Sequence, residues 1–276
     1  MRISSRARPF AGSAVRRALK ILGTTGIASR MQRNSGFDVI GLEMRWGSDE
    51  DFVTRGLVVE RQIDGVPVRF FVLDENDHLQ QHHMHGKWYE EAELELMAKH
   101  FRGGTFVDVG ANVGNHTLYF ALVENASKVI SFEPNPPAFK ACQYSVLLNQ
   151  LGHRVSVQNF GLSDIDEKAA VQWSGERNLG ATKLAPGAGE LVLKNGDNVL
   201  AGELPSFIKI DVETLEMKVL AGLKETISRC RPVIFVEVDP VNEHAFQSYL
   251  EAHNYSIRET IPAAGNTNYL CGPISG

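Results

Sequence analysis

The stretch Phe106-Val-Asp-Val-Gly-Ala-Asn-Val-Gly-Asn-His-Thr117 combines an apolar run, two glycines four residues apart and the first polar residues of a helix. Gly110 permits a tight turn because it has no Cβ, and Gly114 lets the next helix begin close to the strand. A helix that begins there presents unpaired N–H groups and a partial positive charge. The pattern therefore predicts a strand, a turn and a helix of an open α/β sheet, with a ligand at the carboxyl end of the strand.

The turn differs from the fingerprint of dinucleotide-binding proteins, which requires the pattern Gly-x-Gly-x-x-Gly. In this chain Ala111 and then Asn112 follow Gly110, so Asn112 stands where the fingerprint has its middle glycine. The glycine that lets the backbone approach a pyrophosphate is therefore missing. Asp108 stands two positions before the first glycine, where it would repel a diphosphate but would suit a cationic group such as an amine. This combination favours S-adenosylmethionine (SAM) over NAD as the ligand.

A second acidic residue, Glu133, follows the next predicted strand in Phe132-Glu-Pro-Asn-Pro136. A carboxylate at this position can accept hydrogen bonds from both hydroxyls of a ribose. NAD and SAM both carry such a ribose, so Glu133 supports a nucleoside ligand without choosing between the two. Its spacing of one βαβ step from the glycine turn places it at the same edge of the sheet.

Two later strand-like runs, 207–210 and 233–238, also end in acidic residues, which are Asp211, Glu213, Glu237 and Asp239. These side chains are expected to converge with Asp108 and Glu133 on one rim of the sheet. Like charges that are packed together raise one another's pKa, and such a rim is where a general base is expected. Asp211 and Asp239 also resemble an oxygen pair for Mg²⁺. No third ligand is evident, and we expect no metal.

From Thr105 onward, strand-like and helical segments alternate. The expected strands are 105–109, 128–132, 155–160, 207–210 and 233–238, and the expected helices are 114–123, 136–148, 215–227 and 242–253. The alternation predicts a doubly wound, mostly parallel sheet, and apolar strands are typical of a sheet covered on both faces. The segments 255–260 and 268–271 predict a terminal antiparallel hairpin at the sheet edge. Residues 163–206, partly β-like at 169–173 and 191–193, predict an insertion in place of a βα unit.

The pattern of composition divides the chain into three parts. Residues 1–36 are expected to be a basic, flexible N-terminal segment, 37–86 a β-rich preface packed on the core, and 87–276 the ligand-binding domain. In the preface, the alternating runs 57–63 and 66–73 flank Asp64-Gly65, which is a strong hairpin signal. Residues 74–90 and 173–206 are expected to build the pocket for a second substrate.

Several histidines and aromatic residues lie between the preface and the first glycine turn. The segment 74–86 is expected to be a solvated or substrate-facing loop rather than a zinc site, and it contains His78, His82, His83 and His85. A helix is expected over 88–101. Trp88 and Tyr89 would either cover the site or pack against the core, and His116 would either face the ligand or pack.

The charge of the chain is uneven. The net charge is −5, and residues 1–37 contain eight bases and no acid, which leaves −13 for the remainder. An acidic body disfavours nucleic acid as the main partner. The basic segment is open to three readings. The first is a flexible arm, and the second is a helix that contacts an anionic membrane through the face of Val15, Ala18, Leu19 and Leu22. The third is a transit peptide.

The composition is that of a soluble globular protein. With 43% hydrophobic and 22% charged residues among 276, the chain is not collagen-like, low-complexity or disulfide-dense. No apolar run approaches the roughly 18 to 20 residues that span a bilayer. The scattered Cys142, Cys230 and Cys271 indicate reduced thiols. We therefore expect a cytoplasmic protein, peripheral to a membrane if the basic segment binds one.

The motifs together resemble the FkbM family of SAM-dependent methyltransferases. The matching segments are Val107–Asn115, Phe132–Asn135, Gly161–Asp164, Lys209–Glu213 with Glu216 and Val219-Leu220, and Val236-Glu237. Trp88-Tyr-Glu90 also resembles the aromatic–Glu pair that this family carries ahead of its first strand. The similarity covers roughly residues 85 to 255 in the right order and spacing. One departure is Thr214, where the family usually has glycine.

The resemblance implies a class I methyltransferase fold, which is Rossmann-like, and methyl transfer from SAM to a hydroxyl, typically of a sugar, a glycolipid or a natural product. It implies that the glycine turn cradles the methionine end of SAM, that Glu133 binds the ribose, and that Gly161 and Leu162 border the adenine. By this correspondence the cofactor-binding residues are Asp108, Gly110, Asn112, Gly114, Asn115, Glu133, Asn135, Gly161 and Leu162.

Methyl transfer from a sulfonium is an in-line displacement, so the protein mainly aligns donor and acceptor and removes the proton of the attacking alcohol. The candidates for the proton acceptor are Asp211, Glu213 and Glu237, with Asp211 first because of its position at the strand end. A purely orienting role for Asp211 stays open. Two other functions also stay open: an NAD-linked oxidoreductase or epimerase, and a non-catalytic protein that keeps the cofactor fold.

Overall fold

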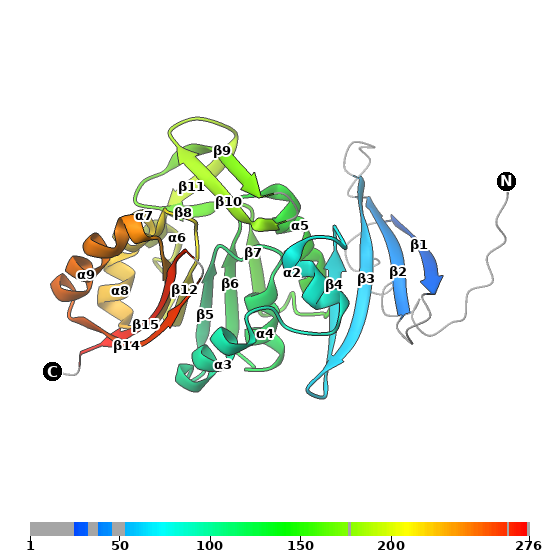
Figure 1. The fold of residues 1–276 in the computed structure, drawn as a ribbon, viewed down its shortest axis with the longest axis horizontal. Coiled ribbons are helices and arrows are strands. Elements are labelled where there is room, and N and C mark those ends of the chain that lie inside the picture. The colour runs from blue at the N-terminus through cyan, green and yellow to red at the C-terminus, as the bar shows by residue number, and fades with distance from the viewer. Residues whose placement is uncertain (1–24, 33–37, 46–52, 176–177, 264, 275–276) are drawn as a thin grey trace.

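The computed structural model describes residues 25–32, 38–45, 53–175, 178–263 and 265–274. Its centre is a seven-stranded sheet in the order β14-β15-β13-β12-β5-β6-β7 (Figure 1). Neighbouring strands run parallel, except that β15 is antiparallel to both β13 and β14. The strands are β5 (Thr105–Val109), β6 (Lys128–Phe132), β7 (Val155–Gln158), β12 (Pro205–Ile210), β13 (Val233–Val238), β14 (Tyr255–Pro262) and β15 (Thr267–Pro273). The predicted doubly wound sheet with a terminal antiparallel hairpin is confirmed.

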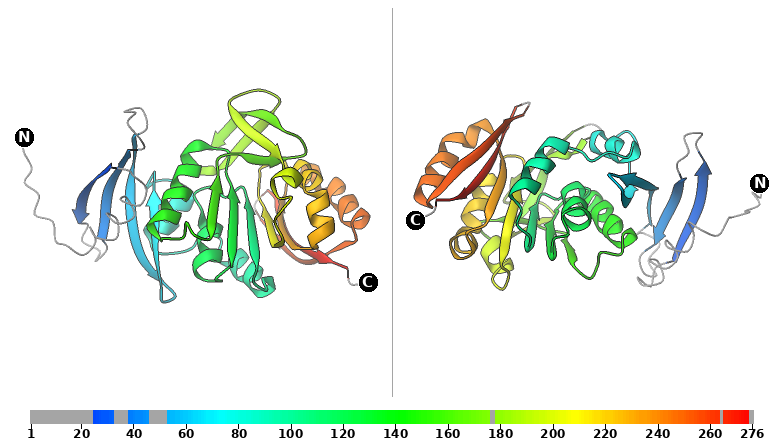
Figure 2. Two further views of the ribbon diagram at one scale, coloured as in Figure 1. Left: turned by 180° about the vertical axis from the view of Figure 1, so that it is seen from behind. Right: turned by 90° about the horizontal axis from the view of Figure 1, so that it is seen from below.

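Alternation along each strand sends side chains to two separate cores. In β5, Phe106 belongs to one buried cluster and Val107 to the other. The helices α3 (Glu91–His100), α4 (Asn115–Leu122) and α5 (Pro136–Leu148) cover the face of Phe106. The opposite face is covered by α6 (Gly196–Val199), α7 (Glu216–Gly222), α8 (Lys224–Cys230) and α9 (Glu243–Ala252), with the short 3-10 helix η2 (Pro240–Asn242) before α9. Figure 2 shows helices on both sides of the central strands.

The N-terminal part forms a four-stranded antiparallel sheet at one end of the molecule (Figure 1). Its strands are β1 (Thr25–Gln32), β2 (Asp38–Arg45), β3 (Val53–Ile63) and β4 (Val66–Val72). Helix α5 contacts the outer edge of β4, where Ser145 Oγ accepts from the Phe71 N–H at 2.9 Å and Asn149 binds both backbone polar groups of Arg69. These bonds satisfy an edge that would otherwise be open for pairing.

The long insertion forms a second small sheet, in the order β10-β9-β11-β8. It lies as a separate layer at one end of the central strands (Figure 1). Its strands are β8 (Gly161–Ser163), β9 (Glu167–Gly175), β10 (Asn178–Pro186) and β11 (Leu191–Asn195). The predicted β character at 169–173 and 191–193 is confirmed. The strand predicted over 155–160 ends earlier, because the chain leaves the central sheet and enters this one at Gly161.

Three expectations on local structure are wrong. Residues 78–84 form a helix, α2 (His78–Met84), instead of a loop, because Asp77 caps it by accepting from the Gln80 N–H at 3.0 Å. The helix expected over 215–227 is two helices, since a close approach of Gly222 to the backbone of Ser163 precedes a break at Leu223. Helix α3 begins at Glu91, because Glu90 has a left-handed backbone conformation with φ 56°.

Other expectations fall partly outside the described residues. Residues 1–24 and 33–37 are not described, so the flexible arm and the helical face of Val15, Ala18, Leu19 and Leu22 are not tested. Strand β1, however, lies within the segment 1–36 and pairs with β2 along its whole length. None of the helices in the described ranges is both long enough and apolar enough to cross a membrane.

Candidate functional site

The glycine turn brings the ends of three neighbouring central strands together. Gly110 has φ 81°, and a Cβ there would overlap the carbonyl oxygen of Asp211. The N–H groups of Gly110 and Ala111 both donate to the Phe132 carbonyl at 3.0 Å. The turn therefore needs glycine both for its conformation and for its contact with the end of β12.

Glu133, at the end of β6, is held by two backbone amides. Its Oε2 accepts from the Asn112 N–H and its Oε1 from the Asn135 N–H, each at 2.8 Å. Burial raises the pKa of Glu133 to about 7, although these two hydrogen bonds oppose the shift. Each carboxylate oxygen keeps a second lone pair, which can accept a hydrogen bond from a ribose hydroxyl.

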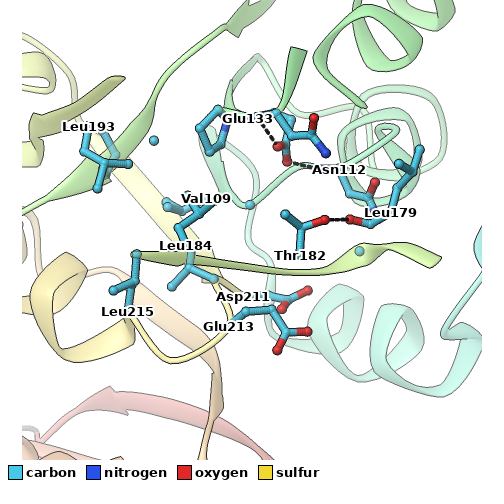
Figure 3. A pocket seen from close by; sticks show the side chains of 17 residues that line it. Val109, Asn112, Glu133, Leu179, Thr182, Leu184, Leu193, Asp211, Glu213 and Leu215 are labelled. Atoms are coloured by element: carbon cyan, nitrogen blue, oxygen red, sulfur yellow. Dashed lines mark hydrogen bonds between the residues drawn. The ribbon is translucent and has the colours of Figure 1, made fainter. Parts of the chain in front are cut away.

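A cavity of about 630 Å³ lies beside Glu133, open solvent at its mouth included; it is called the apolar cavity below. Figure 3 shows Val109, Leu184, Leu193 and Leu215 on one side of it. Glu133 and Asn112 lie toward another side, and Asp211 and Glu213 toward a third (Figure 3). An apolar pocket with one anchored carboxylate suits a planar base joined to a sugar.

A second cavity, of about 560 Å³, adjoins the first and is called the acidic cavity below. Both cavities are lined by Gly110, Asn112, Gly180, Asp211 and Glu213. The acidic cavity is further lined by Leu79, Tyr89, Glu90, Ala111, Asn115, His116, Asn178, Ala181, Lys209 and Glu237. A ligand that extends past the glycine turn would therefore reach from the apolar cavity into the acidic one.

Lys209 forms the floor of the acidic cavity and is 2% exposed. Its Nζ donates to the Gly110 carbonyl at 2.9 Å and lies 3.2 Å from Asp211 Oδ2 and 3.5 Å from Asp108 Oδ1. Burial alone would lower the pKa of Lys209, but Asp211 and Asp108 outweigh it and raise the pKa. The ammonium charge therefore stays in place at all ordinary pH values.

Asp108 occupies a different place from the one expected. Its side chain is fully buried, Thr117 Oγ1 donates to its Oδ2 at 2.7 Å, and Lys209 faces its Oδ1. Asp108 lines neither cavity. Instead of lining a cavity, Asp108 lies beside Lys209, the residue that interrupts β12, and Lys209 lines the acidic cavity.

The turn after β12 holds two left-handed residues in succession. Glu213 has φ 47° and Thr214 φ 79°. The second value is in the region that glycine adopts without strain, which explains physically why a glycine suits this position. Lys183 of β10 lies 3.9 Å from Glu213 and 3.5 Å from Asp239. Asp239 is thus engaged by a lysine, and no cluster of three metal-ligating side chains occurs among the described residues.

Two further glutamates of the acidic cavity have strongly raised pKa values. Burial and then Asp211 raise the pKa of Glu90 to about 8 and that of Glu237 to about 7. Asn266 Nδ2 donates to Glu237 Oε1 at 2.6 Å, which partly opposes the shift. At pH 7 Glu237 is therefore divided between its acid and base forms and Glu90 is mainly protonated, and such raised pKa values are often found in proton-transfer groups.

Asn115, at the start of α4, positions the segment that precedes α3. Its Nδ2 donates to the Tyr89 carbonyl at 2.8 Å, and its Oδ1 accepts from the Tyr89 N–H at 3.1 Å. His83 Nε2 lies 3.1 Å from the same oxygen, and the His83 ring stacks on Phe70 at 3.9 Å. Burial lowers the pKa of His83 to about 4, so it is neutral. His83 is buried, not solvated as expected.

Strand β10 passes over both cavities. A Cβ at Gly180 would come within 2.7 Å of Asn112 Nδ2, so β10 lies directly on the glycine turn. Leu179, Thr182 and Leu184 of β10 line the apolar cavity (Figure 3). The Leu179 N–H donates to Asp77 Oδ2 at 2.9 Å, which ties the cover to the cap of α2.

Residues 108–264 match the methyltransferase FkbM domain. The chain belongs to the FkbM methyltransferase family. It is therefore a methyltransferase with SAM as the methyl donor, and the NAD-linked alternative is wrong. The residues present fit SAM. Glu133 has lone pairs for the ribose, the apolar cavity suits the adenine, and Asn112 Oδ1 is buried without a partner in the described part of the chain.

One curated relative is the AMB antimetabolite synthetase AmbE of Pseudomonas aeruginosa strain PAO1. It is 26% identical over 60% of this chain, and the match covers 10% of AmbE, so the chain spans about a tenth of that protein. A solved FkbM methyltransferase of Methylobacillus flagellatus KT is 17% identical with a TM-score of 0.46, covering 62% of this chain and 44% of that one. The tRNA methyltransferase TrmK of B. subtilis is 14% identical with a TM-score of 0.46, covering 68% of each chain.

The structure brings most of the predicted site residues of this FkbM protein to the two cavities. The predicted residues that line one or both are Gly110, Asn112, Asn115, Glu133, Asn135, Gly161, Leu162, Asp211, Glu213 and Glu237. Asp108 and Gly114 line neither. Gly114 packs instead on Cys142, whose Sγ would be 2.7 Å from an added Cβ.

Other lining residues were left unassigned or undecided by sequence reasoning. Trp88 is buried in the core, whereas Tyr89 lines the acidic cavity. The sequence did not decide for either residue between covering the site and packing against the core. His116 also lines that cavity. Glu90 had a signal in the aromatic–Glu pair, but no role followed from it. Leu184 of β10 belongs to no motif; it lies in the segment 173–206 expected to build the pocket for a second substrate, but it lines the apolar cavity.

Proposed function

We propose that this FkbM methyltransferase is an O-methyltransferase, which transfers the methyl group of SAM to a hydroxyl of a sugar, a glycolipid or a natural product. The observation that carries the proposal is that Asp211 lines both the apolar and the acidic cavity, so that a proton acceptor lies at the junction where donor and acceptor would meet. The name of AmbE, an antimetabolite synthetase, agrees with a natural-product acceptor.

The donor supplies a methyl group that its sulfonium already activates. The acceptor oxygen forms a bond to the methyl carbon while the carbon–sulfur bond breaks, and the electron pair of that bond stays on sulfur. The hydroxyl proton passes to a carboxylate of the acidic cavity. The products are a methyl ether, a protonated carboxylate and S-adenosylhomocysteine. Alignment of the two substrates supplies most of the acceleration, and proton removal supplies the rest.

In this proposal Asp211 accepts the proton. Lys209 engages its Oδ2 at 3.2 Å and fixes the carboxylate at the junction of the cavities. Glu213 and Glu237 are the alternative acceptors, and Lys183 and Asn266 contact them respectively. We also propose that the acceptor is not a nucleic acid, since four carboxylates line its cavity and would repel phosphates.

For the donor, we propose that Glu133 binds the ribose hydroxyls, that Gly161, Leu162 and Asn135 border the adenine, and that Gly110 and Asn112 contact the methionine end. Asp108 acts through Lys209, and Gly114 and Asn115 shape the turn and its neighbours. The anchored carboxylate of Glu133 supports this assignment, because both its oxygens are already oriented by backbone amides.

The test is a screen of glycans and hydroxylated small molecules with the purified protein and isotopically labelled SAM. We expect SAM to bind on its own in calorimetry. At least one acceptor should gain the mass of one methyl group, and NMR should place the new methyl on oxygen. A methyl group on nitrogen or carbon would overturn the proposal of O-methylation. A folded protein that binds SAM but methylates none of these hydroxyl compounds would contradict the proposed acceptor classes.

A further inference from the structure

The acidic cavity contains more carboxyl groups than its own cations can pair with. The carboxylates that line it are Glu90, Asp211, Glu213 and Glu237. Among the described residues, Lys209 is the one lysine or arginine that lines it, and its ammonium is already engaged by Asp211, Asp108 and the Gly110 carbonyl. Lys183 lies near Glu213. The carboxyl groups without a lysine or arginine contact of their own are therefore Glu90 and Glu237, and burial raises the pKa of both.

Beside Glu90 lies the buried imidazole of His116, whose Nε2 has no hydrogen-bond partner in the part of the chain that the structure describes. The His116 side chain is 7% exposed. Burial, and then Lys209, lower the pKa of His116 far below its usual value, so the ring is neutral. Glu90 Oε2 lies 3.7 Å from Nε2, which is too far for a hydrogen bond between them.

A donor group placed to one side of this pair of atoms can reach both. In the tautomer that carries its proton on Nδ1, His116 Nε2 is an acceptor, and the Glu90 carboxylate is an acceptor as well. A nitrogen that lies roughly 2.9 Å from each would donate one hydrogen to the imidazole and one to the carboxylate. A bound ammonium group also favours the ionised form of Glu90, lowers its pKa from about 8, and so forms a charge-assisted hydrogen bond with the carboxylate.

The geometry of this pair is held from outside the cavity. Glu90 has a left-handed backbone conformation and directly follows Tyr89, whose N–H and carbonyl are both bound by the side chain of Asn115. His116 is the next residue after Asn115 on α4. The carboxylate and the imidazole are therefore fixed relative to one another by a single side chain, which is how a preorganised binding site is built.

We infer that Glu90 and His116 bind an ammonium group of the acceptor, so that the hydroxyl substrate is an amino alcohol such as an amino sugar or a hydroxyamino acid. This inference rests on the proposed O-methyl transfer. The methionine end of the donor also has an ammonium group, but Glu213 lines both cavities and is available to it. Glu90 and His116 line the acidic cavity and not the apolar one, where we place the adenosine part of the donor.

The first experiment uses the unmodified protein saturated with S-adenosylhomocysteine. Calorimetry at pH 7 compares matched pairs that differ in one amino group: glucosamine with glucose, galactosamine with galactose, and serinol with glycerol. Any acceptor found in the methylation screen is paired in the same way with its deaminated analogue. We expect the amine of at least one pair to bind about 10-fold or more tightly than its neutral partner. If no amine binds more tightly, the inference is wrong.

The second experiment compares Glu90→Gln with Glu91→Gln, its exposed neighbour on α3. Glu90→Gln should reduce the preference for the amine by about 10- to 100-fold, and Glu91→Gln should leave it unchanged. The affinity for SAM should change less than twofold in both. If Glu90→Gln weakens SAM as much as it weakens the amine, the pair binds the methionine ammonium and the inference is overturned.

Failure of the inference and failure of the proposed function give different results. A protein that binds SAM and methylates neutral alcohols as well as amino alcohols contradicts only the ammonium site. A protein that does not bind SAM contradicts the proposed function itself. If Glu90→Gln does not fold, which a thermal melt reveals, the matched pairs on the unmodified protein still decide the question.

Discussion

Lys209 and Asp211 form an ion pair at the end of β12, with Nζ 3.2 Å from Oδ2. The pair joins the buried interior to the site, because the lysine is 2% exposed and the Asp211 side chain is 32% exposed. Behind it lies the fully buried Asp108, 3.5 Å from the same Nζ. One ammonium therefore compensates a structural carboxylate and fixes a functional one.

We predict that Lys209→Met is strongly destabilising, because it leaves the charge of Asp108 buried without a cation. Loss of one partner of such a pair typically costs about 3–5 kcal/mol. Urea unfolding should show this loss, and the double variant Lys209→Met with Asp108→Asn should recover part of it. The exposed Lys99→Met is the control. A single variant as stable as the wild type would show that Asp108 is protonated or compensated by another group.

Asp211→Asn tests the proton acceptor. The amide keeps the shape of the side chain and can still contact the Lys209 region, but it cannot accept a proton. We expect SAM affinity to be retained and turnover to fall about 10²- to 10⁴-fold. Asp64→Asn, in the exposed turn between β3 and β4, is the matched control, since asparagine tolerates its left-handed φ of 50°. Equal turnover of Asp211→Asn and the wild type would remove Asp211 from this role.

The raised pKa values of the site predict how stability depends on pH. Burial raises the pKa of Glu133 and Glu237 to about 7 and that of Glu90 to about 8, so the folded protein holds these protons more tightly than the unfolded chain does. Stability from these groups is complete below the unfolded pKa of about 4.5 and is lost as pH rises through 7 to 8.

Two buried histidines act in the opposite sense at lower pH. His83 and His116 have lowered pKa values, so the unfolded chain binds more protons than the folded one until pH rises above about 6.5. Only the glutamates contribute above that value. We therefore expect the melting temperature to fall by a few degrees between pH 6.5 and pH 8.5. In the double variant Glu90→Gln with Glu237→Gln the decline should be smaller, and a rise over this interval would contradict the assignment.

A substitution at Thr214 tests the energetic cost of a left-handed backbone conformation. Its φ of 79° strains a β-branched residue, and such strain is of order 1–3 kcal/mol, while glycine costs roughly 0.5–1 kcal/mol in chain entropy. We expect Thr214→Gly to raise the free energy of unfolding by about 1 kcal/mol. Thr214→Ala, which keeps a Cβ, should give less. Destabilisation by Thr214→Gly in denaturant unfolding would mean that contacts of the threonine side chain outweigh its strain.

Much of the fold and the donor side of the site follow from local patterns. The glycine turn and Glu133 could be placed together because the carboxyl ends of neighbouring parallel strands meet at one edge, whatever the loops do. The alternation of Phe106 and Val107 between two cores is likewise a property of the strand itself. These features depend on contacts within one or two βα units.

The acceptor side could not be predicted, because it depends on contacts between distant segments. Glu90 reaches the cavity only because Asn115, 26 residues from Tyr89, binds the backbone there. Asp108 had the right position for a ligand contact, but the sequence does not show that Lys209 would lie beside it and line the acidic cavity instead. The cover of the site by β10 depends on a bond between residues 102 positions apart. A local sequence pattern does not indicate which distant segments of the chain come into contact.

That bond, from the Leu179 N–H to Asp77 Oδ2, can be removed without removing the helix cap. Asp77 caps α2 through Oδ1 and holds β10 through Oδ2. Serine is a good capping residue but has one side-chain oxygen, so Asp77→Ser should keep the cap and release β10, whereas Asp77→Ala should lose both.

We expect Asp77→Ser to increase hydrogen exchange of 178–186 and to weaken SAM binding several-fold, because Leu179 and Leu184 line the donor's cavity. Asp77→Ala should show the same changes with an additional loss of about 0.5–2 kcal/mol in stability. Unchanged exchange in Asp77→Ser would mean that packing on Asn112 alone holds the strand in place.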